Sequence, residues 1–307
     1  MSAGAPVFDK LALVGLGLIG SSIARAAREF GAAREIAALD ASPEVMARVR
    51  ELGLADEASG DPAKALKGAD LVILCVPVGA SGDVAGKLAP FLEKGAVLSD
   101  VGSVKASVVA QVAPMTPEGV AFIPAHPLAG TEFSGPDAGF ASLFRNRWCI
   151  LTPQDGEDPA RVARLAAFWT RFGARVESMT PQHHDLVLAV TSHLPHLIAY
   201  NIVRTADDLG EDTRSEVIKF SASGFRDFTR IAASDPVMWR DIFLNNREAV
   251  LEMLGRFNED LSELQRMIRR GDGEGLFELF TRTRAIRRSI VEQGQDTDAA
   301  DFGRGRS

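Results

Sequence analysis

Histidine is the side chain best suited to exchanging protons near neutral pH, and this sequence of 307 residues contains five. His126 stands alone in the segment FIPAHPLAGTEFSG, directly after an apolar run that predicts a strand. At the carboxyl edge of a parallel sheet, where such sheets bind ligands, this histidine can take the proton of an alcohol while a hydride leaves the same carbon. A histidine at the end of a strand is often only structural, and both interpretations stay open for the residue taken alone.

The other four histidines lie in PQHHDLVLAVTSHLPHLIAY: His183, His184, His193 and His196. This segment predicts a helix that Pro195 opens locally, because proline removes one backbone hydrogen bond. Ser192 and His196 are four residues apart and share one face of that helix. We expect the first two histidines to be exposed at the start of the helix, and His193 to be structural. The H-E-x-x-H spacing of a zinc site is absent and no cysteine accompanies these residues, so we predict no metal site.

A glycine loop, LALVGLGLIGSS, predicts a dinucleotide site. Gly15, Gly17 and Gly20 have the G-x-G-x-x-G spacing between a predicted strand and a predicted helix. The first glycine permits a tight turn, the second lets the backbone approach a pyrophosphate, and the third allows close packing of helix on strand. We expect the whole loop, with Leu16, Leu18 and Ile19, to bind the cofactor. A glycine-rich turn that binds no ligand is the alternative.

The next predicted strand ends in Asp40, twenty residues after the last glycine of the loop. An acid at this place accepts hydrogen bonds from the ribose hydroxyls of NAD and repels the 2′-phosphate of NADP. No arginine follows immediately, and we therefore predict NAD as the cofactor. Val76 and Pro77, in CVPVGA, end another strand at the same edge and are expected to run beside it.

Two further segments carry polar residues that suit ligand contacts. In DVGSVK, which ends a predicted strand, Ser103 can hydrogen-bond the histidine or a substrate hydroxyl, and Lys105 can face an anion. A polar turn that caps the next helix explains the same residues. SGFRDFTRIAASDPVMW contains Arg226, Arg230 and Trp239. Arginines in helical domains usually lie in solvent or in ion pairs, and the tryptophan is equally well explained as a core residue.

The elements that would position these residues fall into two groups. Up to residue 179, short apolar strands alternate with helical patterns, which predicts a parallel, doubly wound α/β sheet. Beyond it only long helical patterns remain, which can pack on the sheet domain or on a second copy of the chain. The predicted strands cover residues 10–17, 35–40, 69–78, 96–103, 120–127, 147–153 and 174–179. The predicted helices cover residues 18–31, 42–53, 158–172, 181–209, 213–224, 236–270 and 273–293.

This pattern predicts a dinucleotide-binding domain in residues 1–179, a helical domain in residues 180–293, and a disordered polar tail in residues 294–307. A net charge of −7 argues against a general partner such as nucleic acid or an anionic membrane. No secretory signal is recognisable, and no apolar run is expected to be long enough to span a bilayer. The two cysteines lie in apolar runs, so we expect a reduced, cytoplasmic protein.

Taken together, GLGLIGSS, DVGSVK, HPLAGTEFSG, TSHLPHLIAY and GFRDFTRIAASDPVMWRDIF resemble the prephenate/arogenate (cyclohexadienyl) dehydrogenase family of tyrosine biosynthesis. The resemblance runs from about residue 11 to residue 251 with the motifs in the expected order. It implies a Rossmann domain followed by an all-α dimerisation domain, similar to the C-terminal part of 6-phosphogluconate dehydrogenases. It also implies a homodimer, with the active site between the two domains.

By this resemblance, His126 is the catalytic base, assisted by Ser103, and Ser192 and His196 line the substrate pocket. The motif singles out Arg230 for a substrate carboxylate, which its planar fork can bind through two hydrogen bonds. Trp239 would close the pocket, either its own or that of a neighbouring subunit. The implied reaction is the NAD-dependent oxidative decarboxylation of prephenate to 4-hydroxyphenylpyruvate.

Three alternatives remain open on the sequence. Arogenate replaces the keto group of prephenate with an ammonium, and the resemblance places a specificity residue downstream on the histidine helix, where Asp207 and Asp208 would favour the amine. Dehydrogenases of 3-hydroxyacids or 6-phosphogluconate share the architecture, but their catalytic lysine motif is not found here. A nicotinamide-nucleotide sensor without turnover would leave the histidines and Arg230 idle.

Overall fold

The computed structural model describes residues 5–131, 133–208, 216, 219–220 and 222–292. Its first half is a parallel six-stranded sheet with the strand order β3-β2-β1-β4-β5-β6. This is the order of a doubly wound dinucleotide-binding sheet. The strands β1 to β3 follow one another toward one edge of the sheet and β4 to β6 toward the other, and all six are parallel. The six strands are β1 (Phe8–Val14), β2 (Ala33–Leu39), β3 (Glu57–Ala58), β4 (Leu71–Leu74), β5 (Val97–Asp100) and β6 (Ala121–Phe122).

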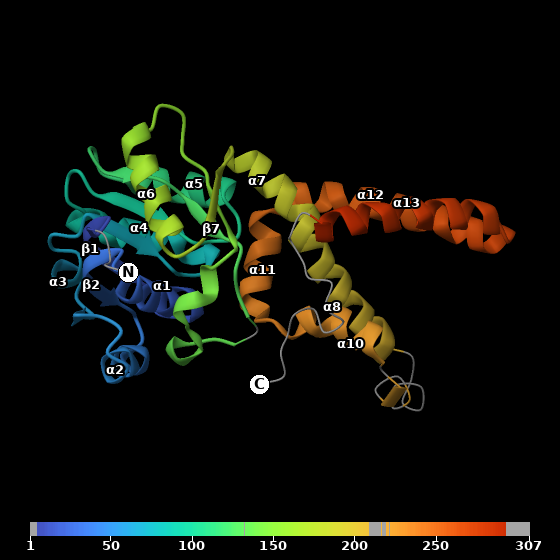
Figure 1. The fold of residues 1–307 in the computed structure, drawn as a ribbon, viewed down its shortest axis with the longest axis horizontal. Helices are drawn as coiled ribbons and strands as arrows, with labels where there is room; N and C mark the ends of the chain where they lie inside the picture. Colours follow the sequence, from blue (N-terminus) through green and yellow to red (C-terminus); the bar gives the residue numbers. More distant parts are fainter. Residues whose placement is uncertain (1–4, 132, 209–215, 217–218, 221, 293–307) are drawn as a thin grey trace. The chain divides into compact units, whose positions relative to one another are not determined.

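Helices cover both faces of this sheet, as the continuous apolar strands predict (Figure 1). On β1, Leu11 and Leu13 face a core cluster shared with the helices α1 (Leu18–Glu29) and α6 (Pro159–Arg171). Ala12 and Val14 face the opposite cluster, which includes residues of α4 (Ser81–Leu88) and α5 (Ala106–Val112). The remaining helices of this half are α2 (Pro43–Glu51) and α3 (Pro62–Ala65).

Local signals in the sequence set several helix ends as predicted. The Ser42 side chain accepts a hydrogen bond from the Val45 amide at the start of α2, and Pro43 occupies its first turn. In the same way the Asp158 carboxylate caps α6 by accepting a bond from the Ala160 amide. Such caps depend on neighbouring residues alone, which is why the sequence reveals them.

The last strands of this half do not join the six-stranded sheet. β7 (Ala125–Pro127) pairs antiparallel with β8 (Trp148–Leu151), and β8 pairs parallel with β9 (Arg175–Ser178). The predicted strand over residues 120–127 is divided between β6 and β7, and Pro124 lies in the interval. His126 therefore lies on the edge strand of a separate three-stranded sheet, beside the carboxyl edge of the main one.

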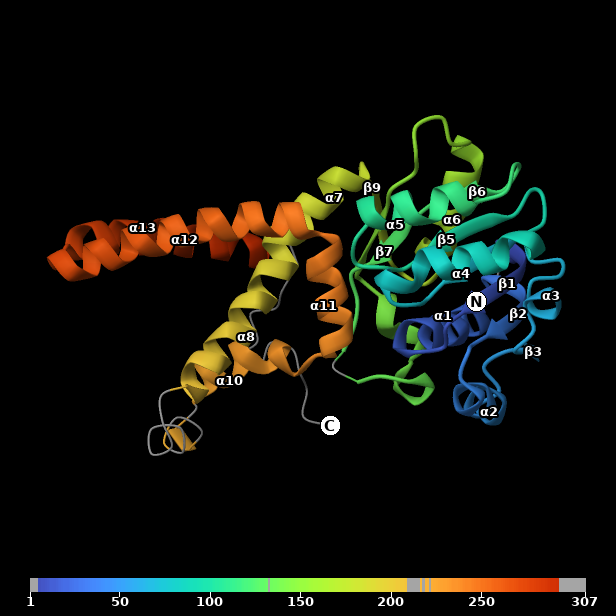
Figure 2. The ribbon, with the colours of Figure 1, turned by 180° about the vertical axis from the view of Figure 1, so that it is seen from behind.

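Helices follow β9, as predicted (Figures 1 and 2). The predicted helix over residues 236–270 is interrupted at Asn246. Half of the predicted helix over residues 213–224 lies outside the described residues, and so does the whole predicted tail over residues 294–307. The observed helices are α7 (Pro181–Leu188), α8 (Leu194–Asp207), α10 (Ser223–Thr229), α11 (Pro236–Asn245), α12 (Arg247–Arg270) and α13 (Gly273–Glu292).

A π-helical turn, Ala189–His193, joins α7 and α8 into one helix and precedes Pro195. In a regular α-helix, residues twelve apart point about 120° away from each other. A π turn takes up about one extra residue, or roughly 100° of rotation, and brings positions 184 and 196 to nearly the same side. The local opening predicted at the proline is this turn.

The joined helix Pro181–Asp207 has 27 residues and contains an 18-residue stretch with a mean hydropathy of 1.4, enough by length and composition to cross a membrane. The expectation that no segment reaches this limit is therefore wrong. Length and composition do not decide the matter, because helices that pack on protein pass the same test. The helix buries His184 and Asp185 against the nucleotide-binding half of the chain.

The chain divides into two compact units, residues 1–250 and 251–307. The first contains the sheet domain together with α7, α8, α10 and α11, and Trp239 and Ile242 of α11 belong to one of its two core clusters. The second contains α13 and α12 from residue 251 on, and these two helices lie side by side in both views (Figures 1 and 2). The domain limits predicted near residue 180 and residue 293 stay predictions.

Candidate functional site

The glycine loop has the shape of a phosphate cradle. Gly15 has a φ of 95°, and a Cβ atom on it would lie 2.5 Å from the Cys75 carbonyl oxygen. A Cβ atom on Gly20 would lie 2.1 Å from the Gly15 carbonyl oxygen, whereas one on Gly17 would meet nothing within 4 Å. Gly17 also begins α1 without a side-chain cap or an acidic residue in the first turn. The open space and the uncapped amides of Leu18 and Ile19 fit a pyrophosphate.

The other predicted cofactor residues lie at the same edge of the sheet. Asp40 follows β2 and accepts hydrogen bonds from the amides of Leu16 (2.8 Å) and Ser42 (2.9 Å). The Leu16 side chain is buried and its amide is already bonded, so this residue shapes the loop rather than offering a donor. Val76 and Pro77 follow Cys75 at the end of β4, the parallel neighbour of β1.

A cavity of about 460 Å³ lies beside this edge, between the sheet domain and the helices that follow it. Six of the predicted site residues, from five separate segments, line this cavity: Ser103, His126, Ser192, His196, Arg230 and Trp239. The rest of the lining is largely apolar: Leu128, Ala129, Gly130, Thr131, Leu188, Thr191, Ile231, Ser234, Met238 and Ile242. A mostly apolar pocket with a few convergent polar groups is typical of a small-molecule site.

His126 is 7% exposed and lies at the wall of this cavity. Its Nδ1 atom is 2.8 Å from Nε2 of His184, and Nδ1 of His184 is 2.8 Å from the Asp185 carboxylate. Burial lowers the pKa of His126 well below 6.5, and the neighbouring His184 and Lys105 act in the same direction. The ring is therefore neutral at pH 7 and able to accept a proton.

His196 and Trp239 form a second wall of the cavity. Their rings are stacked, with centroids 3.7 Å apart and an interplanar angle of 22°. Nδ1 of His196 donates to the Ser192 carbonyl oxygen at 2.8 Å, so Nε2 is the nitrogen left for a ligand. Burial lowers the pKa of His196, and the charge of Arg230 contributes to the shift.

Arg230 ends α10 and begins the 3₁₀ turn Arg230–Ala233, which also supplies Ile231 to the lining. Tyr200 of α8 donates to the Ser234 carbonyl oxygen at 2.9 Å and so fixes the far end of this turn. No aspartate or glutamate is part of the cavity lining among the described residues. The site therefore combines a guanidinium with two imidazoles, a set suited to an anionic ligand.

Comparison with known families identifies the chain. Residues 23–178 match the nucleotide-binding domain of prephenate dehydrogenase, and residues 180–282 match the dimerization domain of prephenate dehydrogenase. The chain belongs to the prephenate dehydrogenase family. The two matches meet at residues 178–180 and together cover most of the chain.

Individual members of the family agree with this assignment. The chain is 44% identical to the cyclohexadienyl dehydrogenase of Zymomonas mobilis, over 92% of this chain and 97% of that protein. A crystal structure of prephenate dehydrogenase from A. aeolicus, in complex with hydroxyphenyl propionate and NAD⁺, has a TM-score of 0.86 and 35% identity over 92% of this chain and 98% of that one. Arogenate dehydrogenase from Synechocystis has a TM-score of 0.79 and 29% identity, covering 92% and 99% of the two chains.

Lys105, one of the predicted substrate-binding residues, lies outside the cavity lining. Lys105 is fully buried, is paired with Asp100, and donates from Nζ to the Ala125 carbonyl oxygen at 2.8 Å. It is not part of the cavity lining, so the expectation that Lys105 faces an anionic substrate is corrected. Its ammonium instead links the end of β5 to β7, next to His126. Arg226, four residues before Arg230, is exposed and lies 3.6 Å from Asp227.

Two residues beside the site were misjudged or missed. His184 was expected to be exposed, but it is fully buried against His126, and only His183 is exposed. Asp185 was not singled out at all. The available signal was its position next to a histidine at the start of a helix that also carries Ser192 and His196. The π turn that aligns these faces is not visible in the sequence.

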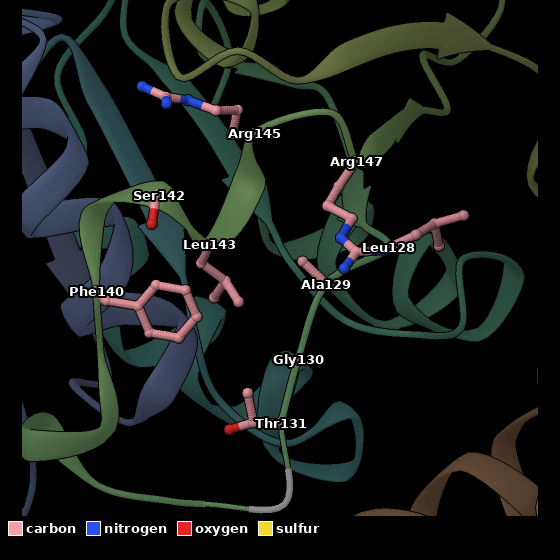
Figure 3. A pocket seen from close by; sticks show the side chains of 9 residues that line it. All are labelled: Leu128, Ala129, Gly130, Thr131, Phe140, Ser142, Leu143, Arg145 and Arg147. Atoms are coloured by element: carbon pink, nitrogen blue, oxygen red, sulfur yellow. The ribbon is translucent and has the colours of Figure 1, made fainter. Parts of the chain in front are cut away.

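A smaller hollow of about 300 Å³ lies next to the cavity, and residues 128–131 line both (Figure 3). Figure 3 shows Arg147 extending toward Leu128 and Ala129, while Arg145 points away from them. None of the predicted site residues lines this hollow. Within the described part of the chain, no group of three or more histidine, cysteine, aspartate or glutamate residues could hold a metal ion.

Proposed function

We propose that this protein is an NAD-dependent dehydrogenase that converts prephenate to 4-hydroxyphenylpyruvate and CO₂. The observation that carries the proposal is a neutral, buried His126 facing a cavity that also contains Arg230 and His196. The glycine loop at the same sheet edge supports the cofactor, and the 44% identity to a cyclohexadienyl dehydrogenase supports the substrate class. Asp40 supports NAD over NADP because its carboxylate would repel a 2′-phosphate.

In this proposal His126 takes the proton of the C4 hydroxyl of prephenate, with Ser103 beside it. Bound NAD supplies the acceptor for the hydride that leaves C4. The ring carboxylate then departs as CO₂, and its bonding electrons make the ring aromatic with negative charge on the C4 oxygen. His126 returns its proton to that oxygen, so the enzyme ends each turnover in its starting state. The protein mainly has to align the groups and hold the proton.

Arg230 and His196 hold the two carboxylates of the substrate in this proposal, and Ser192 adds a hydroxyl at the same wall. Trp239 fixes the His196 ring by stacking on it. Because Nδ1 of His196 is bonded to a carbonyl oxygen, its Nε2 can donate to a carboxylate only when the ring is protonated. Binding of a dianion should therefore bring a proton with it.

This linkage predicts the pH dependence of substrate binding. The pKa of His196 is lowered in the free protein, and a carboxylate against Nε2 raises it. Between the two pKa values binding takes up a proton, so the affinity falls as the pH rises from the lower value to the higher one and is level above it. We expect calorimetric titration with prephenate, without NAD and in buffers of different ionisation enthalpy, to detect up to about one proton per site. Binding without proton uptake, and with an affinity independent of pH from 5 to 9, would contradict this role.

Steady-state kinetics with two substrates and two cofactors test the function itself. We expect NADH to form from prephenate, with a KM for NADP at least about tenfold above that for NAD. Arogenate is the second candidate substrate, because relatives include an arogenate dehydrogenase. Asp207 and Asp208 are not part of the cavity lining, and no other described aspartate or glutamate lines it. We therefore expect a higher kcat/KM for prephenate. Absence of turnover with either substrate would favour a nucleotide sensor.

We also propose that the protein acts as a homodimer through its helical half. The match to a dimerization domain supports this, and so do the exposed apolar side chains on the helix Pro181–Asp207. These side chains are Leu186, Val190, Ile202 and Val203. Burial against a second copy explains such a surface. Location in the cytoplasm stays a prediction.

A further inference from the structure

His126 is the end of a hydrogen-bonded chain that runs away from the cavity. Its Nδ1 atom lies 2.8 Å from Nε2 of His184, whose Nδ1 lies 2.8 Å from Oδ1 of Asp185. Both histidines are buried, and their rings meet at 64° with centroids 5.0 Å apart. The Asp185 carboxylate is anchored in turn by the amides of Lys105 (2.7 Å) and Ala106 (2.8 Å), at the first turn of α5.

The direction of each bond in this chain follows from the carboxylate. Asp185 can only accept, so Nδ1 of His184 carries the proton and Nε2 of His184 is an acceptor. Nδ1 of His126 must then be the donor in the next bond. The neutral His126 ring consequently has its lone pair on Nε2, the nitrogen left for the cavity. The opposite tautomer would present an N–H group to the substrate hydroxyl and could not take its proton.

We propose that His184 and Asp185 are positioning residues that hold His126 in the tautomer able to act as a base. The inference rests on the proposed function and adds a role for two residues that do not line the cavity. When His126 takes the proton, its Nδ1–H group keeps its acceptor, and the Asp185 charge lies one ring further away. This arrangement stabilises the protonated ring without offering a competing base to the substrate.

Among the described residues, the other titratable groups that act on His126 do not stabilise a positive charge on its ring. His193, on the same helix as His184, is neutral, because burial lowers its pKa to about 4. Lys105 carries a positive charge and is paired with Asp100. Cys149 of β8 is uncharged, because burial raises the pKa of its thiol. Burial holds His184 neutral as well, so removing it takes away an acceptor rather than a charge.

The test compares His184→Phe, which keeps a ring but has no acceptor, with His184→Gln, whose amide oxygen can accept from His126. We expect kcat of the phenylalanine variant to fall roughly 100-fold or more, because the base loses its tautomer, while KM changes less than about threefold. The acidic limb of its kcat–pH profile should move to lower pH, since the protonated ring loses its acceptor. The glutamine variant should recover at least about a tenth of the wild-type kcat and return the limb toward its wild-type position.

His183→Gln is the matched control, because His183 is the adjacent histidine and is exposed. It should retain wild-type kcat and KM. Calorimetric titration with NAD and a thermal melt verify that each variant is folded. If His184→Phe does not fold, His184→Leu replaces it, and His184→Gln remains decisive, because a glutamine variant below about 1% of wild-type kcat contradicts the inference.

The outcomes separate this inference from the proposed function. A wild-type protein without turnover on prephenate overturns the function. A wild-type protein that turns over, with a folded phenylalanine variant of unchanged kcat, overturns the positioning role alone. The positioning role is also overturned if kcat of the phenylalanine variant falls while its pH profile stays in place and the glutamine variant recovers no activity. That pattern indicates a packing defect.

Discussion

Replacing His126 with asparagine is expected to lower kcat about 10²- to 10⁴-fold, the usual contribution of a positioned general base. Asparagine keeps an amide near the Nδ1 position and can still donate to Nε2 of His184, so the chain behind it stays in place. It has no basic nitrogen for the substrate proton. We therefore expect KM for prephenate to stay within about threefold, because this side chain is not expected to hold a carboxylate. Single-turnover measurement of NADH formation separates the chemical step from product release.

The pH dependence sharpens this prediction. Since the pKa of His126 lies well below 6.5, wild-type kcat should stay flat above pH 7 and fall in acid as the ring becomes protonated. The asparagine variant should lose that acidic limb together with its activity. A variant with near wild-type kcat would remove His126 from the mechanism. A variant of low kcat that retains the limb would assign the limb to another group.

The glycine loop, Asp40 and the alternation of strands and helices in the first half are largely readable from the sequence, because they follow from local geometry. A glycine with positive φ, a cap, or an apolar strand between two helices depends on near neighbours in the chain. The separate sheet that carries His126 is not readable in this way. Its antiparallel pairing joins residues 125–127 to residues 149–151, and apolar patterning alone does not reveal which strands pair.

The predicted site residues likewise differ in how far the sequence alone describes their surroundings. Ser192 and His196 share one helix, and Tyr200 of that helix donates to the Ser234 carbonyl oxygen at the end of the Arg230 turn, so all three residues line one cavity. Lys105 and His184 were misjudged because their environment is tertiary. The Lys105 ammonium is paired with the buried Asp100, and the His184 ring is buried against His126 of another element. Buried polar partners of this kind follow from packing, which the sequence does not display.

Replacing Arg230 with methionine is expected to raise KM for prephenate about 100-fold, with a smaller effect on kcat. Methionine keeps much of the length of the side chain but removes the guanidinium, and charge-assisted bonds to a carboxylate contribute roughly 1.5–3 kcal/mol each. Arg230→Lys should recover only part of this loss, because an ammonium keeps the charge without the two-pronged geometry. Initial-rate kinetics over a wide range of prephenate concentrations measure both parameters.

Arg226→Met is the matched control for this change. Arg226 belongs to the same motif and lies on α10, four residues before Arg230, but its guanidinium lies 3.6 Å from Asp227 and it is not part of the cavity lining. Its KM should stay within about twofold of wild type, since an exposed ion pair contributes little. If both methionine variants raise KM equally, a general loss of positive charge explains the effect. Arg230 would then lose its assignment as a carboxylate ligand.

Product inhibition then shows which carboxylate Arg230 holds. The product 4-hydroxyphenylpyruvate retains the side-chain carboxylate and has lost the ring carboxylate. If Arg230 binds the side chain, Arg230→Met should weaken inhibition by the product as much as it raises KM for prephenate. If Arg230 binds the ring carboxylate, product inhibition should be almost unchanged, and the side chain then belongs to His196. In that second case the methionine variant should also slow decarboxylation, because Arg230 would orient the group that leaves.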